Sequence, residues 1–367
     1  MRIGIVREIK ENERRVGLTP SGAGALAAAG HEVRVESGAG SACGFADLSY
    51  EAAGAKLATT AEAWNAELVI KVKEPLESEL RFLREQIVFT YLHLAGVSES
   101  LTRALLDAGT TAMAYETVRD EQGRLPLLVP MSAVAGSMAP LMGSYYLAQF
   151  NGGRGTLIAE LVGEPNGKVV IIGDGVVGRH AARTAGALGA RELVVFGLDD
   201  AHAAELERSI TRLKFVLSTP EAIAAELVDA DLVIGAVLIQ GARAPRVVTE
   251  DMVKSMPEGS VIVDVSIDQG GCVATSRPTS HTYPIYVRHG VIHYCVTNMP
   301  GAYPRTSTVA LTTATLPYIQ RIADGGLDAV LADPGFAQGI NVHAGRIRHP
   351  AVAEALGLED RYEALGG

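Results

Sequence analysis

Two residues of types that can catalyse reactions lie in or directly after apolar runs of this sequence. His93 lies in FTYLHLA, a run whose other residues are suited to burial, and a buried neutral imidazole could act as a general acid or base near neutral pH. The alternative is a core histidine bonded to a backbone carbonyl. Asp268 follows the apolar run SVIVDVSI, and ligands of open α/β sheets bind at the carboxyl ends of strands. Both residues are therefore candidates for catalysis.

Cationic side chains form a second set of candidates, suited to binding a carboxylate. Lys71 and Lys73 alternate with apolar residues in VIKVKEP, and Arg14 and Arg15 lie in the charged stretch KENERRVGLTP. Arginine can hold a carboxylate through two parallel hydrogen bonds. The alternatives are solvated lysines and a surface salt bridge of an arginine.

A glycine-rich stretch predicts a dinucleotide site. VVIIGDGVVG places Gly173, Gly175 and Gly178 at G-x-G-x-x-G spacing, directly after a strand pattern and before a helix pattern. Such glycines permit a tight turn, close approach of the backbone to a pyrophosphate, and close packing of helix on strand. The helix N-terminus favours phosphate groups. A purely structural turn is the alternative.

The acidic residue that would bind the adenosine ribose is displaced from its usual position. It is expected about 20 residues beyond the loop, where Phe196 and Gly197 stand, and the acids Asp199 and Asp200 come slightly later. We predict that Asp199 reaches the ribose from a loop and holds it weakly. Because no arginine or lysine stands beside it to favour a 2′-phosphate, NAD is the expected cofactor. Asp174 beside a pyrophosphate is unfavourable unless its side chain points outward.

The elements that must position these residues alternate between strands and helices. Strand patterns cover residues 2–6, 31–36, 67–75, 86–95, 110–118, 168–172, 192–196, 229–238, 259–268 and 291–296. Helix patterns cover residues 21–30, 98–109, 131–150, 179–189 and 307–326, and residues 152–155 and 163–167 are typical of loops. This alternation predicts an α/β protein with parallel sheets. We expect a discontinuous domain of residues 1–130 and 306–367, with a second domain, 131–305, inserted in it.

Length and composition exclude several classes of protein. A chain of 367 residues is long enough for two domains. A net charge of -10 without a basic cluster argues against binding nucleic acid. Three widely spaced cysteines form no metal or disulfide pattern. No signal peptide or membrane-spanning run is present, so we expect a cytoplasmic protein.

The chain closely resembles alanine dehydrogenases of the alanine dehydrogenase/pyridine nucleotide transhydrogenase family over essentially its whole length. The matching stretches include REIKENERRVGLTP, VIKVKEP, FTYLHLA, GDGVVG, VDVSIDQGGC and YCVTNMPGAYPRTST. KVKEP, IDQGG and NMP in this order are highly specific. The resemblance implies two Rossmann-like domains, a discontinuous substrate domain and an inserted NAD-binding domain with a parallel sheet.

The resemblance also implies a role for individual residues, and no metal. Arg15 and Lys73 would hold the substrate carboxylate, and His93 would be the catalytic acid and base. Asp268 would be the second catalytic residue, beside the nicotinamide. The residues that would line the cofactor, besides those of the glycine loop, are Ser132, Val176, Val177, Ser218, Val237, Leu238, Val265, Ser266, Ile267, Asp268, Arg277, Val296, Thr297, Asn298 and Met299.

The implied reaction is reversible, NAD-dependent oxidative deamination of L-alanine to pyruvate and ammonium. The family resemblance further implies a homo-oligomer, a hexamer by analogy. Three alternatives stand beside this reading: a dehydrogenase for another small L-amino acid, a transhydrogenase-like nucleotide-binding module, and an impaired paralogue with a regulatory role. The presence of Arg15, Lys73, His93 and Asp268 argues against the last two. The chain departs from the family at residues 132–137, which read SAVAGS in place of SEVAGR.

Overall fold

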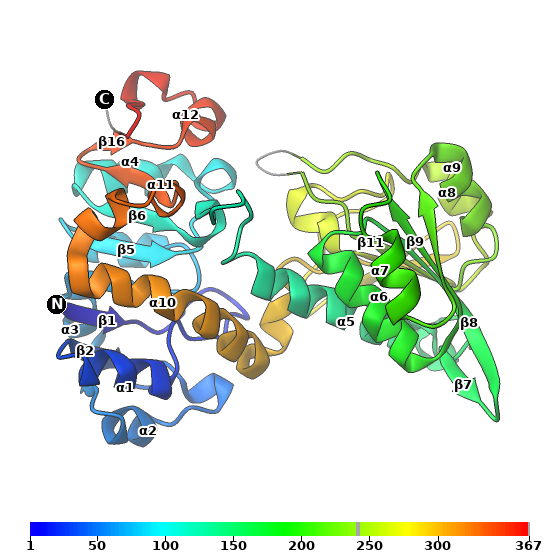
Figure 1. The fold of residues 1–367 in the computed structure, drawn as a ribbon, viewed down its shortest axis with the longest axis horizontal. Coiled ribbons are helices and arrows are strands. Elements are labelled where there is room, and N and C mark those ends of the chain that lie inside the picture. The colour runs from blue at the N-terminus through cyan, green and yellow to red at the C-terminus, as the bar shows by residue number, and fades with distance from the viewer. Residues whose placement is uncertain (240–242, 366–367) are drawn as a thin grey trace. The chain divides into compact units, whose positions relative to one another are not determined.

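Residues 1–239 and 243–365 are described by the computed structural model, and they divide into two compact units. Unit 1 is Met1–Met131 with Tyr303–Gly367, and unit 2 is Ser132–Ala302. Each unit is built on its own, mostly parallel sheet (Figure 1). The predicted α/β fold class is confirmed.

The sheet of unit 1 has the strand order β16-β15-β6-β5-β4-β1-β2-β3. Its strands are β1 (Arg2–Ile5), β2 (Glu32–Glu36), β3 (Lys56–Ala58), β4 (Leu68–Ile70), β5 (Ile87–Thr90), β6 (Thr111–Ala114), β15 (Ile340–His343) and β16 (Arg346–Ile347). The first six run parallel, and β15 adds antiparallel to β6 with Ile340 opposite Met113. Near-continuous burial of these short apolar runs explains why their patterns read as parallel strands.

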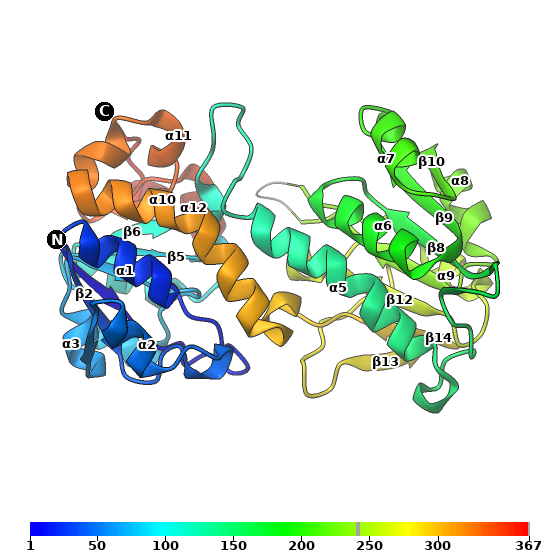
Figure 2. The same cartoon turned by 60° about the horizontal axis from the view of Figure 1, so that its bottom comes forward.

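Helices cover both faces of this sheet. They are α1 (Pro20–Ala28), α2 (Asp47–Ala52), α3 (Thr60–Trp64), α4 (Glu99–Asp107), α10 (Pro304–Leu331), α11 (Pro334–Ala337) and α12 (Pro350–Leu356). Thr19 caps α1 by accepting the N–H of Gly22, and Thr59 forms a capping box with Glu62 at α3. Helix α10 packs beside α1 (Figure 2), and its backbone is interrupted at Gly326.

The sheet of unit 2 has the order β10-β9-β8-β11-β12-β14-β13, with β7 paired to β8. Its strands are β7 (Ala159–Leu161), β8 (Glu164–Ile172), β9 (Ala190–Gly197), β10 (Leu213–Leu217), β11 (Leu232–Gly235), β12 (Val261–Asp264), β13 (Ile285–Arg288) and β14 (Val291–Tyr294). Its helices are α6 (Val176–Leu188), α7 (Ala203–Ser209), α8 (Pro220–Leu227) and α9 (Glu250–Ser255), and α5 (Val129–Leu147) enters it from unit 1.

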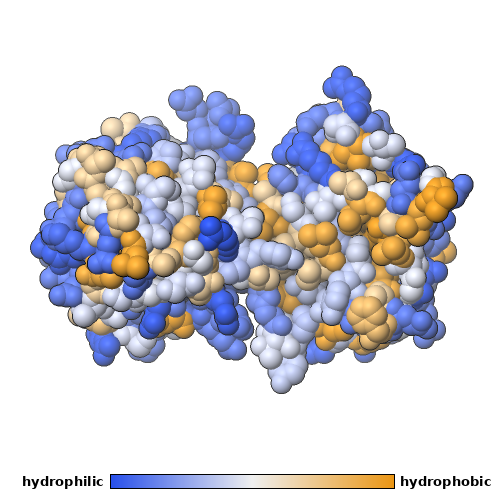
Figure 3. Space-filling view, turned by 90° about the horizontal axis from the view of Figure 1, so that it is seen from below, coloured by the Kyte–Doolittle hydropathy of each residue, from blue (hydrophilic) through white to orange (hydrophobic). Residues whose placement is uncertain are grey.

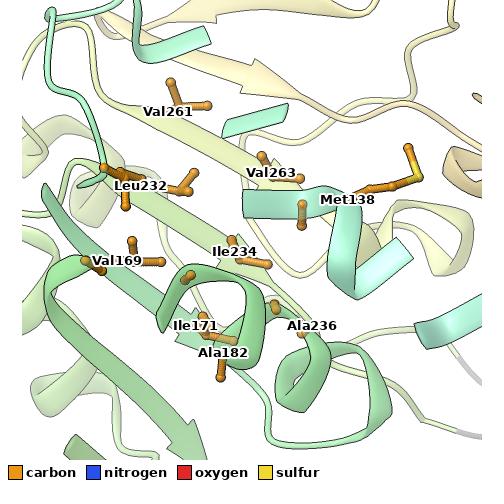
Figure 4. Close-up of a cluster of buried hydrophobic side chains, with 14 of the residues drawn as sticks. Met138, Val169, Ile171, Ala182, Leu232, Ile234, Ala236, Val261 and Val263 are labelled. Atoms are coloured by element: carbon orange, nitrogen blue, oxygen red, sulfur yellow. The ribbon is translucent and has the colours of Figure 1, made fainter. Parts of the chain in front are cut away.

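Alternate residues of the strands of unit 2 pack on opposite faces. Val169 and Ile171 of β8 join a core that includes side chains of α5 and α6 (Figure 4). Their neighbours Val170 and Ile172 join a second core with side chains of α8 and α9. A strand buried on both faces is therefore fixed in register, and so is the loop that follows it.

Several predicted strands end earlier in the structure, among them those at 67–75, 110–118 and 259–268, which end at Ile70, Ala114 and Asp264. Two further differences change the local fold. Residues 163–167 were expected to be a loop, but β8 begins at Glu164 and pairs with β7 in a hairpin. Val162 and Gly163 at its tip both have positive φ, 53° and 82°, as a two-residue hairpin turn requires. The strand expected at 86–95 ends at Thr90, so His93 lies beyond it.

None of the helices formed by residues 1–239 and 243–365 combines the length and apolarity needed to cross a membrane.

Candidate active site

Four polar side chains of unit 1 follow the carboxyl ends of neighbouring parallel strands. Glu8 follows β1, Lys73 follows β4, His93 follows β5, and Glu116 lies in the 3-10 turn (Tyr115–Thr117) after β6. The strands stand in the order β6-β5-β4-β1. Because the carboxyl ends of parallel strands lie at the same edge of a sheet, these four titratable groups are gathered at one edge, where ligands of open α/β sheets bind.

His93 lies in a strained backbone position with an accessible ring. Its φ and ψ are 48° and 37°, and its side chain is 46% exposed. The expectation of a buried imidazole is wrong, and so is the alternative of a core histidine. Its ring stacks parallel to that of Tyr91, with centroids 5.8 Å apart. A left-handed conformation is costly for a residue with a side chain, so the surrounding contacts must hold it.

Glu116 supplies those contacts. Its carboxylate accepts the N–H groups of Leu92 at 3.3 Å and His93 at 2.6 Å. The same carboxylate lies 3.6 Å from Nδ1 of His93. Glu116 therefore fixes the backbone turn that carries the histidine, and it places a negative charge beside the ring.

A buried carboxylate fixes the backbone of Lys73. Glu8 Oε1 accepts the N–H of Val72 at 2.6 Å and that of Lys73 at 3.3 Å. Its other oxygen lies 3.3 Å from Nζ of Lys71, which also donates to Glu79 at 2.8 Å. Lys71 is fully buried, so its expected solvation is wrong. The two lysines have separate environments, because the side chain of Lys73 is only partly buried.

Lys71→Met is expected to lower the free energy of unfolding by about 3–5 kcal/mol, because it leaves the carboxylates of Glu8 and Glu79 buried without their shared cation. Burial alone would lower the pKa of Lys71, but the two carboxylates raise it above its usual value. The stabilisation is therefore present below the ordinary lysine pKa and is lost as pH rises through the higher folded value. Urea unfolding at neutral pH measures it. The exposed Lys56 of β3 provides the control, Lys56→Met, and equal stability of both variants would contradict the prediction.

Arg15 is buried and paired, whereas Arg14 is exposed. Glu13 accepts from Arg15 Nε at 2.7 Å and from Nη2 at 2.5 Å, a two-point ion pair that fixes the guanidinium plane. Nη1 donates to the sulfur of Met131 at 2.9 Å. Burial would lower the pKa of Arg15, but the hydrogen bond and charge of Glu13 raise it. The guanidinium therefore stays cationic inside unit 1.

Most of the predicted cofactor residues follow the carboxyl ends of parallel strands in unit 2. The glycine loop follows β8, Asp199 follows β9 and Ser218 follows β10. Val237 and Leu238 follow β11, residues 265–268 follow β12, and residues 296–299 follow β14. Ser266, Ile267, Val296 and Met299 are buried as whole residues, whereas their neighbours Val265, Thr297 and Asn298 are partly exposed and can be reached by a ligand. Sequence positions more than 100 residues apart thus gather at one sheet edge.

The glycine loop has the predicted strand–turn–helix form. Gly173 has a φ of 109°, and a Cβ atom on it would lie 2.5 Å from the carbonyl oxygen of Ala236. A Cβ atom on Gly178 would lie 1.8 Å from the carbonyl oxygen of Gly173, whereas one on Gly175 would meet nothing within 4 Å. Gly175 is the N-cap of α6 and provides no side-chain cap. The N-terminal N–H groups of α6 therefore face a side of the loop with room for a ligand.

Asp268 is an exposed carboxylate in the 3-10 turn (Val265–Gln269) after β12. Its Oδ1 accepts the N–H of Asn298 at 3.3 Å and so links the ends of β12 and β14. The turn is shaped by the buried Asp264, which accepts the N–H groups of Ser266 and Cys272 at 3.1 and 3.0 Å. Burial raises the pKa of Asp264 above its usual value, although hydrogen bonds from Ser276, Val273 and Cys272 act to lower it.

Ser132 and Arg277 do not directly follow any of these strands in the sequence. Ser132 is the first residue of unit 2, within α5. Arg277 lies on an exposed segment, with its guanidinium 4.2 Å from the ring centroid of Tyr286. Sequence reasoning missed Glu8, Glu13 and Glu116. Glu8 follows the predicted strand 2–6 by two residues, and Glu116 lies near the end of the predicted strand 110–118, so their place at the end of an apolar run was a usable indication.

Comparisons with known proteins agree over both units. Residues 4–135 match the family described as "Alanine dehydrogenase/PNT, N-terminal domain", and residues 139–350 match its "C-terminal domain". A relative from Halomonas elongata, named alanine dehydrogenase, is 51% identical over 98% of each chain. A solved L-alanine dehydrogenase is 47% identical with a TM-score of 0.93, covering 97% of this chain and 99% of its own. A solved transhydrogenase from Sinorhizobium meliloti is 25% identical with a TM-score of 0.83, covering 95% and 100%.

Proposed function

The chain belongs to the alanine dehydrogenase/pyridine nucleotide transhydrogenase family, and from this membership we propose that it catalyses reversible oxidative deamination of L-alanine with NAD. The products are pyruvate and ammonium. The observation that carries the proposal is 51% identity, over 98% of the chain, to a relative named alanine dehydrogenase. The lower identity of 25% to the transhydrogenase makes a nucleotide-binding module the weaker reading.

Unit 1 is proposed as the substrate domain. Arg15 and Lys73 would hold the carboxylate of alanine as a pair of cations after β1 and β4. Glu13 fixes the guanidinium of Arg15, and Glu8 fixes the backbone of Lys73. His93 would accept a proton from the attacking water and return one to the departing nitrogen, as a half-exposed imidazole next to a carboxylate can do. Glu116 would act by holding the histidine in place.

Unit 2 is proposed as the NAD domain. When bound, NAD supplies one part of the chemistry, because it accepts the α-hydrogen of alanine as a hydride. The pyrophosphate of NAD would lie on the N–H groups of Gly175–Gly178, because Gly175 alone among the three glycines of the loop has open space beside it. Asp268 would stand beside the nicotinamide, where a carboxylate stabilises a cationic nitrogen as it develops. The remaining strand-end residues except Asp199, together with Ser132 and Arg277, would line the cofactor. Asp199 was predicted from the sequence as the ribose contact, but its carboxylate accepts the N–H of Ala201 in a local turn, so it is left out of the proposed site.

Two glycine variants separate ligand contact from packing. Gly175→Ala is expected to leave thermal unfolding unchanged and to weaken NADH binding at least about ten-fold, because the added methyl enters ligand space. Gly178→Ala is expected to lower stability by about 1–3 kcal/mol as well, because its methyl collides with the Gly173 carbonyl. Fluorescence titration with NADH and thermal melting measure the two effects. Unchanged NADH affinity in Gly175→Ala would contradict this use of the loop.

A substrate panel tests the proposed reaction. Purified protein, NAD and single amino acids are followed by absorbance of the reduced nicotinamide. The expected result is rapid reduction with L-alanine, slower reduction with other small L-amino acids, and none with D-alanine. Faster turnover of another amino acid would favour the alternative dehydrogenase. NADH binding without turnover of any amino acid would favour the transhydrogenase-like module.

We also propose that the protein forms a homo-oligomer through unit 2, a hexamer by family analogy. Large apolar side chains are exposed at the end of α5 and on the hairpin of β7 and β8, among them Tyr145, Phe150, Leu161 and Val162. Figure 3 shows hydrophobic side chains gathered on the face of unit 2 seen from below. Apolar groups gathered on a surface mark sites of association. Light scattering of the purified protein measures the state, and a monomer at working concentration would contradict the proposal.

A further inference from the structure

We propose that Asp174, between the first two glycines of the loop, binds the adenosine ribose and excludes NADP. The inference rests on the NAD-dependent activity proposed above and deepens it, because it names the residue that selects the cofactor. The ligand class is a dinucleotide whose adenosine ribose carries an unesterified 2′-hydroxyl group.

Strand β9 ends without the carboxylate that usually accepts hydrogen bonds from the ribose. Its last residue is Gly197. The neighbouring strand β8 is in register with it, Ile172 opposite Phe196, and the N–H of Gly173 donates to the Phe196 carbonyl at 2.9 Å. The next residue of the loop, Asp174, is therefore beside the end of β9.

The side chain of Asp174 fills the space beyond Gly197. A Cβ atom on Gly197 would lie 2.9 Å from Cγ of Asp174 and 2.4 Å from Cζ of Phe215. A strand-end acid and an aspartate at position 174 therefore compete for the same space. The carboxylate comes from position 174 and not from position 197, but it lies beside the end of β9, where a strand-end acid would lie.

A histidine fixes the carboxylate at one of its two oxygens. Oδ2 of Asp174 lies 2.7 Å from Nδ1 of His202, the residue before α7. Across the two described stretches of chain, the structure gives Oδ1 no hydrogen-bond partner, and the side chain remains 18% exposed. A carboxylate held in this way can accept a hydrogen bond from a ribose hydroxyl. Its negative charge repels a 2′-phosphate at the same place.

Asp199 is the competing candidate and the matched control. Asp199 carries the same charge as Asp174 and follows strand β9 by two residues. Its Oδ1, however, accepts the N–H of Ala201 at 3.0 Å, so it closes the turn that leads to α7. Asp174 occupies the space that a strand-end acid at position 197 would need, whereas Asp199 lies on the exposed segment beyond it. This placement favours Asp174 as the ribose contact. The direction of Asp174 toward β9 also explains how an acid is tolerated in a pyrophosphate loop.

The experiment compares wild type, Asp174→Asn and Asp199→Asn as binders of three reduced cofactors. Nicotinamide fluorescence gives dissociation constants for NADH, NADPH and the 2′-deoxyadenosine analogue of NADH. Wild type should prefer NADH to both others. Asp174→Asn should lose about ten- to a hundred-fold in affinity for NADH, the effect of one charged hydrogen bond. It should lose less for NADPH, and it should no longer distinguish NADH from the deoxy analogue. Asp199→Asn should stay within about two-fold of wild type.

Two results would overturn the inference: wild-type discrimination in Asp174→Asn, or the same losses in Asp199→Asn alone. Circular dichroism checks that the variants are folded, and Asp174→Ser repeats the series with a shorter neutral side chain. The result is independent of turnover. A wild type that binds NADH as expected but does not oxidise alanine contradicts the proposed function and leaves the cofactor selection intact.

Discussion

Lys73→Ala is expected to reduce alanine turnover by about 10³–10⁴-fold and to leave the fold intact. One charged hydrogen bond to the substrate carboxylate is worth roughly ten- to a hundred-fold. Misplacement of the reacting carbon by about 1 Å costs roughly another 10²-fold. The substitution keeps the backbone N–H that Glu8 accepts, so the end of β4 should not move. Steady-state rates with alanine and NAD measure the loss.

Two comparisons make this result specific. Lys56→Ala removes an exposed lysine of the same unit and should keep wild-type rates. NADH affinity, measured by fluorescence, should be equal in wild type and Lys73→Ala, because the proposed cofactor residues belong to unit 2. Near-normal turnover in Lys73→Ala would remove this lysine from the proposed carboxylate site.

His93→Ala is expected to lower the maximal rate by about 10²–10⁴-fold, the usual worth of a general acid and base. The side chain is half-exposed, so its truncation should leave no cavity in a core. His93→Gln retains a hydrogen-bonding group that cannot take up a proton near neutral pH. Both variants should therefore lose the same factor, together with the wild-type dependence of rate on pH.

The left-handed backbone at His93 gives this experiment an internal control. Glu116 holds that turn through N–H groups, so the histidine variants should unfold at nearly the wild-type temperature. His343→Gln changes another histidine of unit 1, on β15, and should keep the wild-type pH profile. An unchanged profile in His93→Gln would show that proton transfer belongs to another group.

The sequence predicted those site residues whose pattern lies within one short stretch of the chain. The loop of Gly173–Gly178 could be read directly, because its spacing and its flanking strand and helix lie within one stretch. His93 could be placed near a strand end, but not in a left-handed turn, since the residue that stabilises the turn is Glu116, 23 positions later. Lys71 looked like a solvated residue because its partner Glu8 becomes a neighbour only when β1 and β4 pair.

For the fold, too, features with a local sequence pattern were predicted, and features that depend on strand pairing were not. Alternation of apolar runs predicted the parallel strands, whose burial is almost continuous. The hairpin of β7 and β8 was missed because it begins with Glu164, Pro165 and Asn166, residues of low strand propensity that only the pairing with β7 extends. Asp174 shows the same limit, since its contact with the end of β9 depends on the register between two strands.

The insertion of unit 2 within unit 1 sets an order of assembly during synthesis. Strand β15 pairs with β6, joining Ile340 to Met113 across 227 positions (340 − 113). While the ribosome is still translating the intervening segment, β6 has an unpaired edge, and such an edge invites association with other chains. All of Ser132–Ala302 has emerged before β15 exists, so unit 2 can fold first. The sheet of unit 1 can be completed only after β15 has been synthesised. Contacts between residues so far apart in the sequence make this final step of folding slow.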